Sequence, residues 1–299
     1  MSALAKTTLF PPQLASEMFS KIVGHSTIAK LSASEPIPFN GKDVFTFDFS
    51  NNVSIVGEGA AKPAGDAAVT AVQIRPVKVV YQSRVNEEFK YAAEEVKLQY
   101  LKEFADGFTK KMAAAIDVMA FHGVNPATGS ASDIIGNNHF DYAIPSANKI
   151  VLGHDSTAID KNIEEAIAKV EDAELPVNGI AMAPAARTAM ADLTQNSGER
   201  KYPDFAFGAF PAALGNGKLD VNATVSANSN KDRVIVGDFQ NAFRWGFAKE
   251  IPLEMIEYGN PDGGTYDLKQ ANQVLLRSEA YIGWAIMNGA SFARVYVNP

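Results

Sequence analysis

Cysteine is absent from the 299-residue sequence. Its absence excludes disulfides, thiolate zinc sites, iron–sulfur ligation and cysteine nucleophiles. Histidine is scarce as well: the four histidines include no pair at helical ligand spacing and no Glu-x-x-His arrangement, so we expect no metal site. The Gly-x-Ser-x-Gly pattern of serine hydrolases is also missing. The sequence therefore gives no positive case for an enzyme, and we predict no catalytic residue and no cofactor.

Positive charge is in short supply, because 27 lysines and arginines face 34 acidic residues, which gives a formal net charge of -7. A protein that grips nucleic acid normally carries a basic surplus, so we expect no dedicated nucleic-acid site. The longest strongly apolar run, Tyr281–Met287, is far below the roughly 18 residues of a membrane span. The N-terminus has no secretory signal pattern. These features predict a soluble protein, made inside the cell, with no membrane partner.

Residues 1–40 have the composition of an extended arm. Prolines at both ends, Pro11–Pro12 and Pro36 with Pro38, disfavour regular structure there. Between them four apolar residues recur at helix-like spacing: Leu14, Met18, Phe19 and Ile22. We expect a short amphipathic helix that packs against the body of its own chain or against a neighbour.

The next segment predicts a long two-stranded arm. Val44–Phe49 alternates apolar and polar residues as a strand does, and Val69–Val80 is a second candidate strand. The stretch between them, Gly57–Asp66, is small, polar and rich in glycine. It resembles a phosphate loop only superficially, since Pro63 follows Lys62 and no Lys-Ser/Thr pair is present. An isolated hairpin is marginally stable, so the arm implies a partner surface.

Residues 92–121 give the strongest helix pattern, with apolar residues at alternating steps of three and four. At about 1.5 Å per residue this helix would be roughly 40 Å long, which suits a structural spine. His122 at its end is interpreted as an ordinary terminal residue. Trp245 and Trp284 are predicted to be core or interface anchors.

After residue 129 the pattern alternates between helices and strands. One helix is predicted with a cap at Ser156 or Thr157, an apolar face within Ile159–Val170 and an end before Pro176, and a second helix at Pro184–Leu193. Strands are predicted at Gly179–Ala183, Leu219–Val225, Arg233–Gly237, Ala242–Phe247, Leu253–Tyr258, Asn272–Met287 and Ser291–Val297. The fold class is therefore α+β.

Several segments, in this order, resemble the major capsid proteins of tailed bacteriophages with the HK97 fold. Val56–Pro63 is similar to the extended-loop motif of that family, and Asn86–Glu88 to the acidic start of its spine helix. The match continues through the end of the predicted helix at Asp117–Gly123 and the Pro-x-x-Gly turn at Pro126–Gly129. Val234–Phe239, Gln273–Arg277 and Glu279 are similar to the closing strands. The order of elements agrees over nearly the whole chain.

The resemblance implies an HK97-like capsid fold with five segments. These are an N-arm (1–40), an extended loop or E-loop (41–80), a peripheral domain (81–149) with a spine helix at 92–121, an axial α/β domain (150–270), and return strands of the peripheral domain (271–299). It also implies inter-subunit contacts through the E-loop tip at Gly57, Glu58, Gly59, Lys62 and Pro63. The N-arm would add contacts through Leu14, Met18, Phe19 and Ile22.

The implied function is that of a structural virion protein, with no enzyme activity. The chain would self-assemble as hexamers and pentamers into an icosahedral phage head that encloses double-stranded DNA without sequence recognition. Assembly would take place in the cytoplasm of the bacterial host. Portal and possible decoration proteins would be partners, and the start of the arm near Met1 predicts a separate scaffold protein.

Two further points follow from the same resemblance. Some members join a loop lysine to an asparagine of another subunit; Lys62 lies in the matching loop, but no asparagine or glutamate is identified for it, so we do not predict this crosslink. An encapsulin-like nanocompartment shell, which encloses enzyme cargo, is the alternative function.

Overall fold

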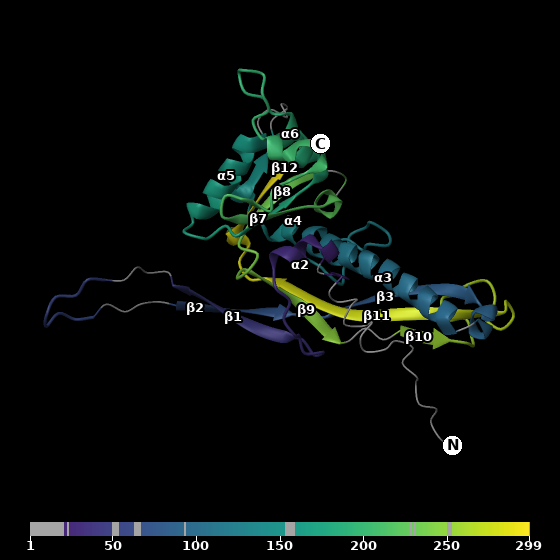
Figure 1. Ribbon diagram of the computed structural model, residues 1–299. Helices are drawn as coiled ribbons and strands as arrows, with labels where there is room; N and C mark the ends of the chain where they lie inside the picture. The colour runs from purple at the N-terminus through teal and green to yellow at the C-terminus, as the bar shows by residue number, and fades with distance from the viewer. Residues whose placement is uncertain are drawn as a thin grey trace.

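The computed structural model describes residues 21–22, 24–49, 54–62, 67–92, 94–152, 159–227, 229, 231–249 and 253–298. This part of the chain is elongated: a long helix and a sheet form one body, a mixed sheet with two helices stands above it, and a hairpin extends to one side (Figure 1). Most of the segments in which apolar residues recur at periods of two or near 3.6 form the strands and helices predicted for them, and the exceptions are given below.

The elements have the following bounds. The helices are α2 (Thr27–Leu31), α3 (Glu94–His122), α4 (Phe140–Ala143), α5 (Ile159–Glu171) and α6 (Pro184–Asp192). The strands are β1 (Lys42–Phe49), β2 (Ala67–Ile74), β3 (Val77–Asn86), β4 (Lys149–Val151), β5 (Gly179–Met182), β6 (Ala213–Leu214), β7 (Gly217–Val221), β8 (Asp232–Gly237), β9 (Phe243–Lys249), β10 (Leu253–Ile256), β11 (Gln273–Ile286) and β12 (Phe292–Tyr296). None of the described helices is long and apolar enough to cross a membrane.

The projecting hairpin is the antiparallel pair β1 and β2, with Lys42 opposite Ile74 at its base and Phe49 opposite Ala67. The predicted second strand Val69–Val80 is in fact two strands, β2 and β3. Arg75 and Pro76 separate them because proline has no N–H to donate to a ladder. β2 therefore belongs to the hairpin, whereas β3 belongs to the body.

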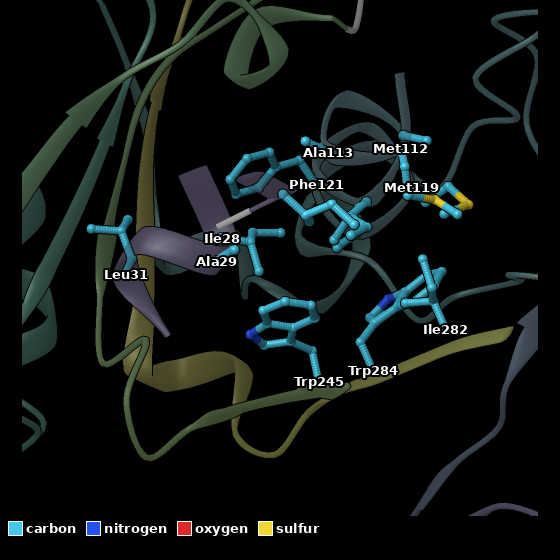
Figure 2. Packing of buried hydrophobic residues seen from close by; sticks show 14 of the residues in the cluster. Ile28, Ala29, Leu31, Met112, Ala113, Met119, Phe121, Trp245, Ile282 and Trp284 are labelled. Carbon is cyan, nitrogen blue, oxygen red and sulfur yellow. The ribbon is translucent and has the colours of Figure 1, made fainter. Parts of the chain in front are cut away.

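β11 is the central strand of the lower sheet. It pairs antiparallel with β3 along ten residues, from Gln273 opposite Asn86 to Ile282 opposite Val77. β10 and β9 share its other edge. The spine helix α3 lies along this sheet (Figure 1). Figure 2 shows Trp245 and Trp284 side by side beneath residues of α2 and α3; each tryptophan is 1% exposed, so the prediction of core anchors is confirmed.

The upper sheet has six strands in the order β4-β12-β8-β5-β7-β6, with parallel and antiparallel pairs. A second apolar core lies between this sheet and the helices α5 and α6. The predicted strand Leu219–Val225 is shorter and earlier: β7 ends at Val221, and Ala223–Ser226 forms a 3₁₀ turn (η5) capped by the side chain of Asn222. An asparagine that accepts from a nearby N–H favours a turn over a strand.

Strand pairing divides the chain differently from the predicted ranges 150–270 and 271–299. β9 and β10 lie within the first range but pair with β11 in the lower sheet. β12 lies within the second range but pairs with β8 and β4 in the upper sheet. Local patterns identified these strands but do not specify which sheet they join, because several of their pairing partners are remote in sequence.

The described part of the N-terminal arm packs against the body of its own chain. After α2, residues 33–37 form an extended strap along β9, where Glu35 N–H donates to Trp245 O at 2.9 Å and Ile37 N–H donates to Phe247 O at 3.3 Å. Gly246 permits this crossing, since a Cβ there would lie 1.7 Å from Glu35 O.

Candidate assembly site

The predicted loop residues lie at the tip of the hairpin. Gly57, Glu58, Gly59 and Lys62 are exposed, and Ala60 N–H donates to Gly57 O at 3.1 Å to close a turn. Gly59 has φ +80°, a left-handed conformation that glycine adopts without strain. Pro63 lies outside the described residues. The geometry is that of a hairpin tip, since residues 54–62 contain a turn and no helix, and β2 begins at Ala67.

One face of the hairpin carries uncovered apolar side chains. Phe45 is opposite Ala71 in the ladder and 62% exposed, and Val69, two residues from Ala71 on the same face, is 56% exposed. A fully buried Val or Phe contributes about 1.5–3 kcal/mol relative to an exposed one. The single chain leaves this energy unused along the hairpin.

The predicted contact residues of the N-arm are only partly placed. Leu14, Met18 and Phe19 lie outside the described residues. Ile22 is described and is 0% exposed within the single chain, where it belongs to the lower core. Ile22 is therefore buried within its own chain, which is one of the two packing partners that its apolar spacing left open.

A buried polar cluster, which we call the arm junction, joins the N-terminal arm to the body. Its centre is Asp117 of α3, which is 0% exposed. Asp117 Oδ1 accepts from Ser26 Oγ at 2.5 Å and from Ile28 N–H at 3.1 Å. Its Oδ2 accepts from Thr27 N–H at 2.9 Å and from Thr224 Oγ1 at 2.8 Å. One carboxylate therefore caps the start of α2 and also ties η5 to the spine helix.

The environment of Asp117 changes its acidity. Burial raises the pKa of Asp117 to about 6, although the four hydrogen bonds favour the charged form and limit the rise. A second aspartate, Asp220 of β7, accepts from Thr27 Oγ1 and from Lys30 Nζ, each at 2.6 Å. The arm is thus attached to both the spine helix and the upper sheet through two carboxylates.

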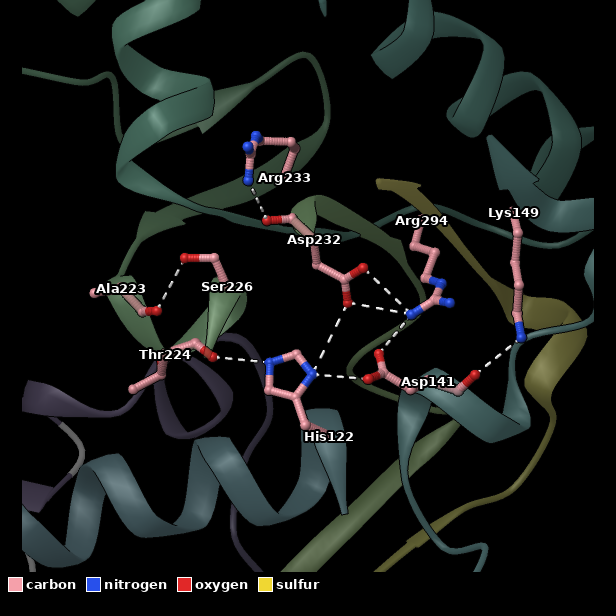
Figure 3. A network of polar contacts seen from close by, with 9 residues as sticks. All are labelled: His122, Asp141, Lys149, Ala223, Thr224, Ser226, Asp232, Arg233 and Arg294. Carbon is pink, nitrogen blue, oxygen red and sulfur yellow. Dashed lines mark hydrogen bonds and ion pairs between the residues drawn. The ribbon is translucent and has the colours of Figure 1, made fainter. Parts of the chain in front are cut away.

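A second cluster, the charge junction, lies where α3 ends (Figure 3). His122 Nδ1 is 3.0 Å from Asp141 Oδ2, and its Nε2 is 3.0 Å from Thr224 O. Arg294 Nη1 donates to Asp141 Oδ1 at 2.6 Å and to Asp232 at 3.2 and 3.3 Å. These contacts connect α3, α4, β8 and β12, so the long helix is fixed to the upper sheet at its C-terminal end.

The groups of the charge junction titrate together. Burial lowers the pKa of His122, but the hydrogen bond to Asp141 and the charges of Asp141 and Asp232 outweigh it and raise that pKa. Burial also raises the pKa of Asp141, yet His122 and Arg294 hold it well below its usual range. For Asp232, burial and the adjacent Asp141 carboxylate raise the pKa. The cluster therefore favours a positively charged histidine beside an ionised Asp141.

Three of these residues have the spacing of a metal site, because His122, Asp141 and Asp232 offer ligand atoms within 4.8 Å of one another. The guanidinium of Arg294 already contacts both carboxylates. Both ring nitrogens of His122 already have hydrogen-bond partners, the carboxylate of Asp141 and the carbonyl oxygen of Thr224. A metal ion would need a ring nitrogen without a proton and would face the charge of Arg294. The arrangement therefore fits an internal salt-bridge network and does not fit a metal centre.

Sequence reasoning missed both junctions, and it took His122 for an ordinary terminal residue. One pattern could have identified them: Asp117 and His122 are the two polar residues of the otherwise apolar run Ala113–His122. A carboxylate inside an apolar helical stretch requires buried partners. Those partners, Ser26 and Thr224, lie 91 and 107 residues away, so no local pattern specifies them.

The arrangement of hairpin arm, spine helix along a sheet, and separate mixed sheet is the HK97-like capsid fold. A solved structure from Mycobacterium phage Ogopogo is 29% identical, covers 92% of each chain and has a TM-score of 0.79. One from Gordonia phage Cozz is 24% identical, with 92% of this chain and 87% of that chain covered and a TM-score of 0.76. A capsid of a native GTA particle shares the fold at 11% identity and a TM-score of 0.64, over 100% of this chain and 96% of that chain.

Residues 7–296 match the Phage capsid family, and the chain belongs to that family. It is a structural protein, a phage major capsid protein and a component of the virion. A comparison with curated protein sequences gives no significant match. The encapsulin-like alternative is not favoured by these comparisons.

Proposed function

We propose that copies of this chain assemble as hexamers and pentamers into an icosahedral phage head that encloses double-stranded DNA. The observation that carries the proposal is the hairpin, whose apolar face is uncovered in the single chain at Phe45 and Val69. A two-stranded sheet of this kind is marginal alone and gains stability when a third surface covers it. Another copy of the chain provides that surface in a shell built from one protein.

In this proposal the hairpin lies over the neighbouring subunit, with Gly57, Glu58, Gly59, Lys62 and Pro63 of its tip in contact with that subunit. Leu14, Met18 and Phe19 of the arm make further contacts. Because donor and acceptor surfaces differ, each contact is head-to-tail, and such contacts form rings when the rotation closes. The shell is then held by many modest contacts in place of one tight pair.

The net charge of the chain supports a shell that does not recognise the sequence of the DNA inside it. A net charge of -7 offers no surplus of cations for phosphate neutralisation, so the enclosed DNA is held without sequence recognition. A scaffold protein, a portal and decoration proteins complete the particle, which assembles in the cytoplasm of the bacterial host. No catalytic residue or cofactor has a role in this function.

The test uses two adjacent substitutions on opposite faces of β2. Val69→Asp places a charge on the apolar face of the hairpin, and Thr70→Asp places the same charge on the other face. Negative-stain microscopy of the expressed proteins should show shells for the wild type and for Thr70→Asp, and free subunits or capsomers for Val69→Asp. Normal shells from Val69→Asp would contradict the role of this face. Small monodisperse particles from the wild type would contradict the proposed function itself.

A further inference from the structure

The imidazole of His122 lies between two hydrogen-bond acceptors (Figure 3). Its Nδ1 is 3.0 Å from Asp141 Oδ2, and its Nε2 is 3.0 Å from Thr224 O. A backbone carbonyl and an ionised carboxylate accept hydrogen bonds and donate none, whereas a neutral imidazole has a single N–H. Both contacts are hydrogen bonds only when both ring nitrogens carry a proton, so this geometry belongs to the imidazolium.

Removal of one proton breaks one of the two contacts, and the charges decide which one. The hydrogen bond to the Asp141 carboxylate is charge-assisted and therefore stronger than the bond to a peptide carbonyl. The remaining proton stays on Nδ1, and the lone pair of Nε2 then faces the lone pairs of Thr224 O. The His122 side chain is 0% exposed, so water does not relieve this repulsion. Deprotonation therefore loosens η5 from the end of α3.

Charged and titratable groups from several elements lie around the imidazole. Burial lowers the pKa of His122, but the hydrogen bond to Asp141 and the charges of Asp141 and Asp232 outweigh it and raise that pKa. Burial lowers the pKa of His139, so its ring adds little charge near neutral pH. The groups that surround His122 are His139 and Asp141 at α4, Lys149 of β4, Asp232 and Arg233 of β8, and Arg294 of β12.

Thr224 belongs to both junctions. Its O is the partner of His122 Nε2, and its Oγ1 donates to Asp117 Oδ2 at 2.8 Å. Asp117 in turn accepts from the backbone of Thr27 and Ile28, at the start of α2. One residue of η5 thus contacts the charge junction and the arm junction through separate atoms.

A second contact of the same turn reaches the arm directly. Asn222 caps η5 with its side-chain oxygen, which accepts from Thr224 N–H at 3.2 Å, and its Nδ2 donates to His25 O at 3.1 Å. Val225, within the turn, is 0% exposed and packs in the lower core. η5 therefore cannot move away from His122 without a change in its contacts to the arm.

We propose that the two junctions form one proton-dependent clamp, in which η5 transmits the protonation of His122 to the attachment of the N-terminal arm. With the imidazolium in place, Thr224 is held through its O and its Oγ1, and the arm is fixed on α3. Without that proton, η5 shifts and the buried carboxylate of Asp117 loses one of its donors, so the arm is held less tightly. The clamp belongs to the single subunit, so failure of the proposed function would leave it untouched.

The arm should loosen as the pH rises. The native pKa of His122 lies above the value of about 6.5 for an unfolded histidine. The contribution of the imidazolium is therefore complete below about 6.5 and is lost as the pH rises through the native pKa. Asp117, whose pKa burial raises to about 6, is already mostly ionised in that window.

Hydrogen exchange of the free full-length subunit tests the clamp. The amides of Thr27 and Ile28 donate to Asp117, so their protection factors report the attachment of the arm. Between about pH 7 and 9 these factors should fall roughly threefold to tenfold, as expected for the loss of one hydrogen bond. Amides of Ile180 and Ala181 in β5 are the reference for global unfolding and should change less. Protection at Thr27 and Ile28 that stays constant, or falls only in step with β5, would overturn the proposal.

A matched pair of variants tests the role of η5. Thr224→Ser keeps the hydroxyl and should keep the pH response of the arm. Thr224→Val removes the hydroxyl at nearly the same volume, so protection of Thr27 and Ile28 should be low throughout and change little with pH. A wild-type response in Thr224→Val would show that η5 does not transmit the signal.

Asp232 is the competing titrating group, because burial and the adjacent Asp141 carboxylate raise its pKa to about 7. Asp232→Asn removes a negative charge 3.9 Å from His122 Nδ1, so the response should keep its size and move to lower pH. His122→Gln has no titrating ring and should abolish the response. If Asp232→Asn abolishes the response, the inference is overturned. The Thr224 pair leaves every charged group in place, so it tests the clamp even if His122→Gln does not fold.

Discussion

Ser26 and Asp117 are 91 residues apart in the sequence, yet Ser26 Oγ donates a 2.5 Å hydrogen bond to Oδ1 of Asp117. Ser26 also caps α2 from within, since its Oγ accepts from Ala29 N–H at 3.1 Å. The hydroxyl therefore connects an internal helix cap to a buried carboxylate of the spine helix. This relationship fixes the point at which the N-terminal arm leaves the body.

A double-mutant cycle measures how strongly the two residues are coupled. Ser26→Ala should lower the free energy of unfolding by about 1–2 kcal/mol, because a cap and a hydrogen bond are both lost. The effect should be smaller in an Asp117→Asn background, with a coupling energy on the order of 1 kcal/mol. Urea unfolding of the free subunit gives all four values. Strict additivity would show that the two side chains act independently.

Asp117 should also make stability depend on pH. Its native pKa of about 6 lies above the roughly 3.9 of an unfolded aspartate, so the native state binds more protons between these values. This contribution to stability is complete below the unfolded pKa and is lost as the pH rises through about 6, by about 3 kcal/mol in all. Asp117→Asn should flatten this part of the profile.

The matched control for that profile is Asp106→Asn, on the same helix. The side chain of Asp106 is 47% exposed and pairs with Lys21 at 2.7 Å, so Asp106→Asn removes a carboxylate from the same helix without disturbing a buried group. Unfolding free energies at several pH values test the contrast. An unchanged slope in Asp117→Asn would mean that Asp117 is not the titrating group.

Arg294 should be the most sensitive residue of the charge junction. Arg294→Met removes the arginine that Asp141 and Asp232 share, and breaking such a buried pair costs about 3–5 kcal/mol. The double variant Arg294→Met with Asp232→Asn should recover part of the loss, because one buried negative charge is removed with its partner. Lys78→Met, which breaks a more exposed pair with Glu279 at 2.9 Å, should cost much less. Equal losses from Arg294→Met and Lys78→Met would contradict this ranking.

Gly246 tests whether the strap depends on close backbone contact. In Gly246→Ala the new methyl group would lie 1.7 Å from Glu35 O, and the strap must shift at a cost of about 1–3 kcal/mol. Gly57→Ala is the control, since no atom lies within 4 Å of a Cβ at that position. Thermal unfolding should show a lower Tm for the first variant alone. A wild-type Tm for Gly246→Ala would mean that the strap is not held tightly on β9.

Local patterns predicted most of the elements, because spacing alone determines whether an apolar face is helical or extended. The spine helix begins at Glu94 and ends at His122, close to the predicted 92–121, and β11 lies at Gln273–Ile286 against the predicted Asn272–Met287. Tertiary partners could not be obtained this way. β12 was identified as a strand and still joins the upper sheet, since its partners β4 and β8 are remote in sequence.

The functional residues divide in the same way. The position of the hairpin tip was predicted from the glycine-rich composition of the stretch between the two strands, since glycine favours turns. The contacts of Asp117, His122 and Arg294 depend on atoms brought together only by folding, up to 153 residues apart in the case of Arg294 and Asp141.

The continuity of β2 with β3 has a mechanical consequence. The hairpin is attached to the body through Arg75 and Pro76, and the next ten residues are paired with β11 in an antiparallel ladder. The hairpin, β3 and β11 extend in nearly the same direction (Figure 1). A neighbour that pulls on the hairpin therefore loads the β3–β11 hydrogen bonds together, in shear. Tension across a shell built from this chain would be shared along one ladder, and the strands would not peel apart one bond at a time.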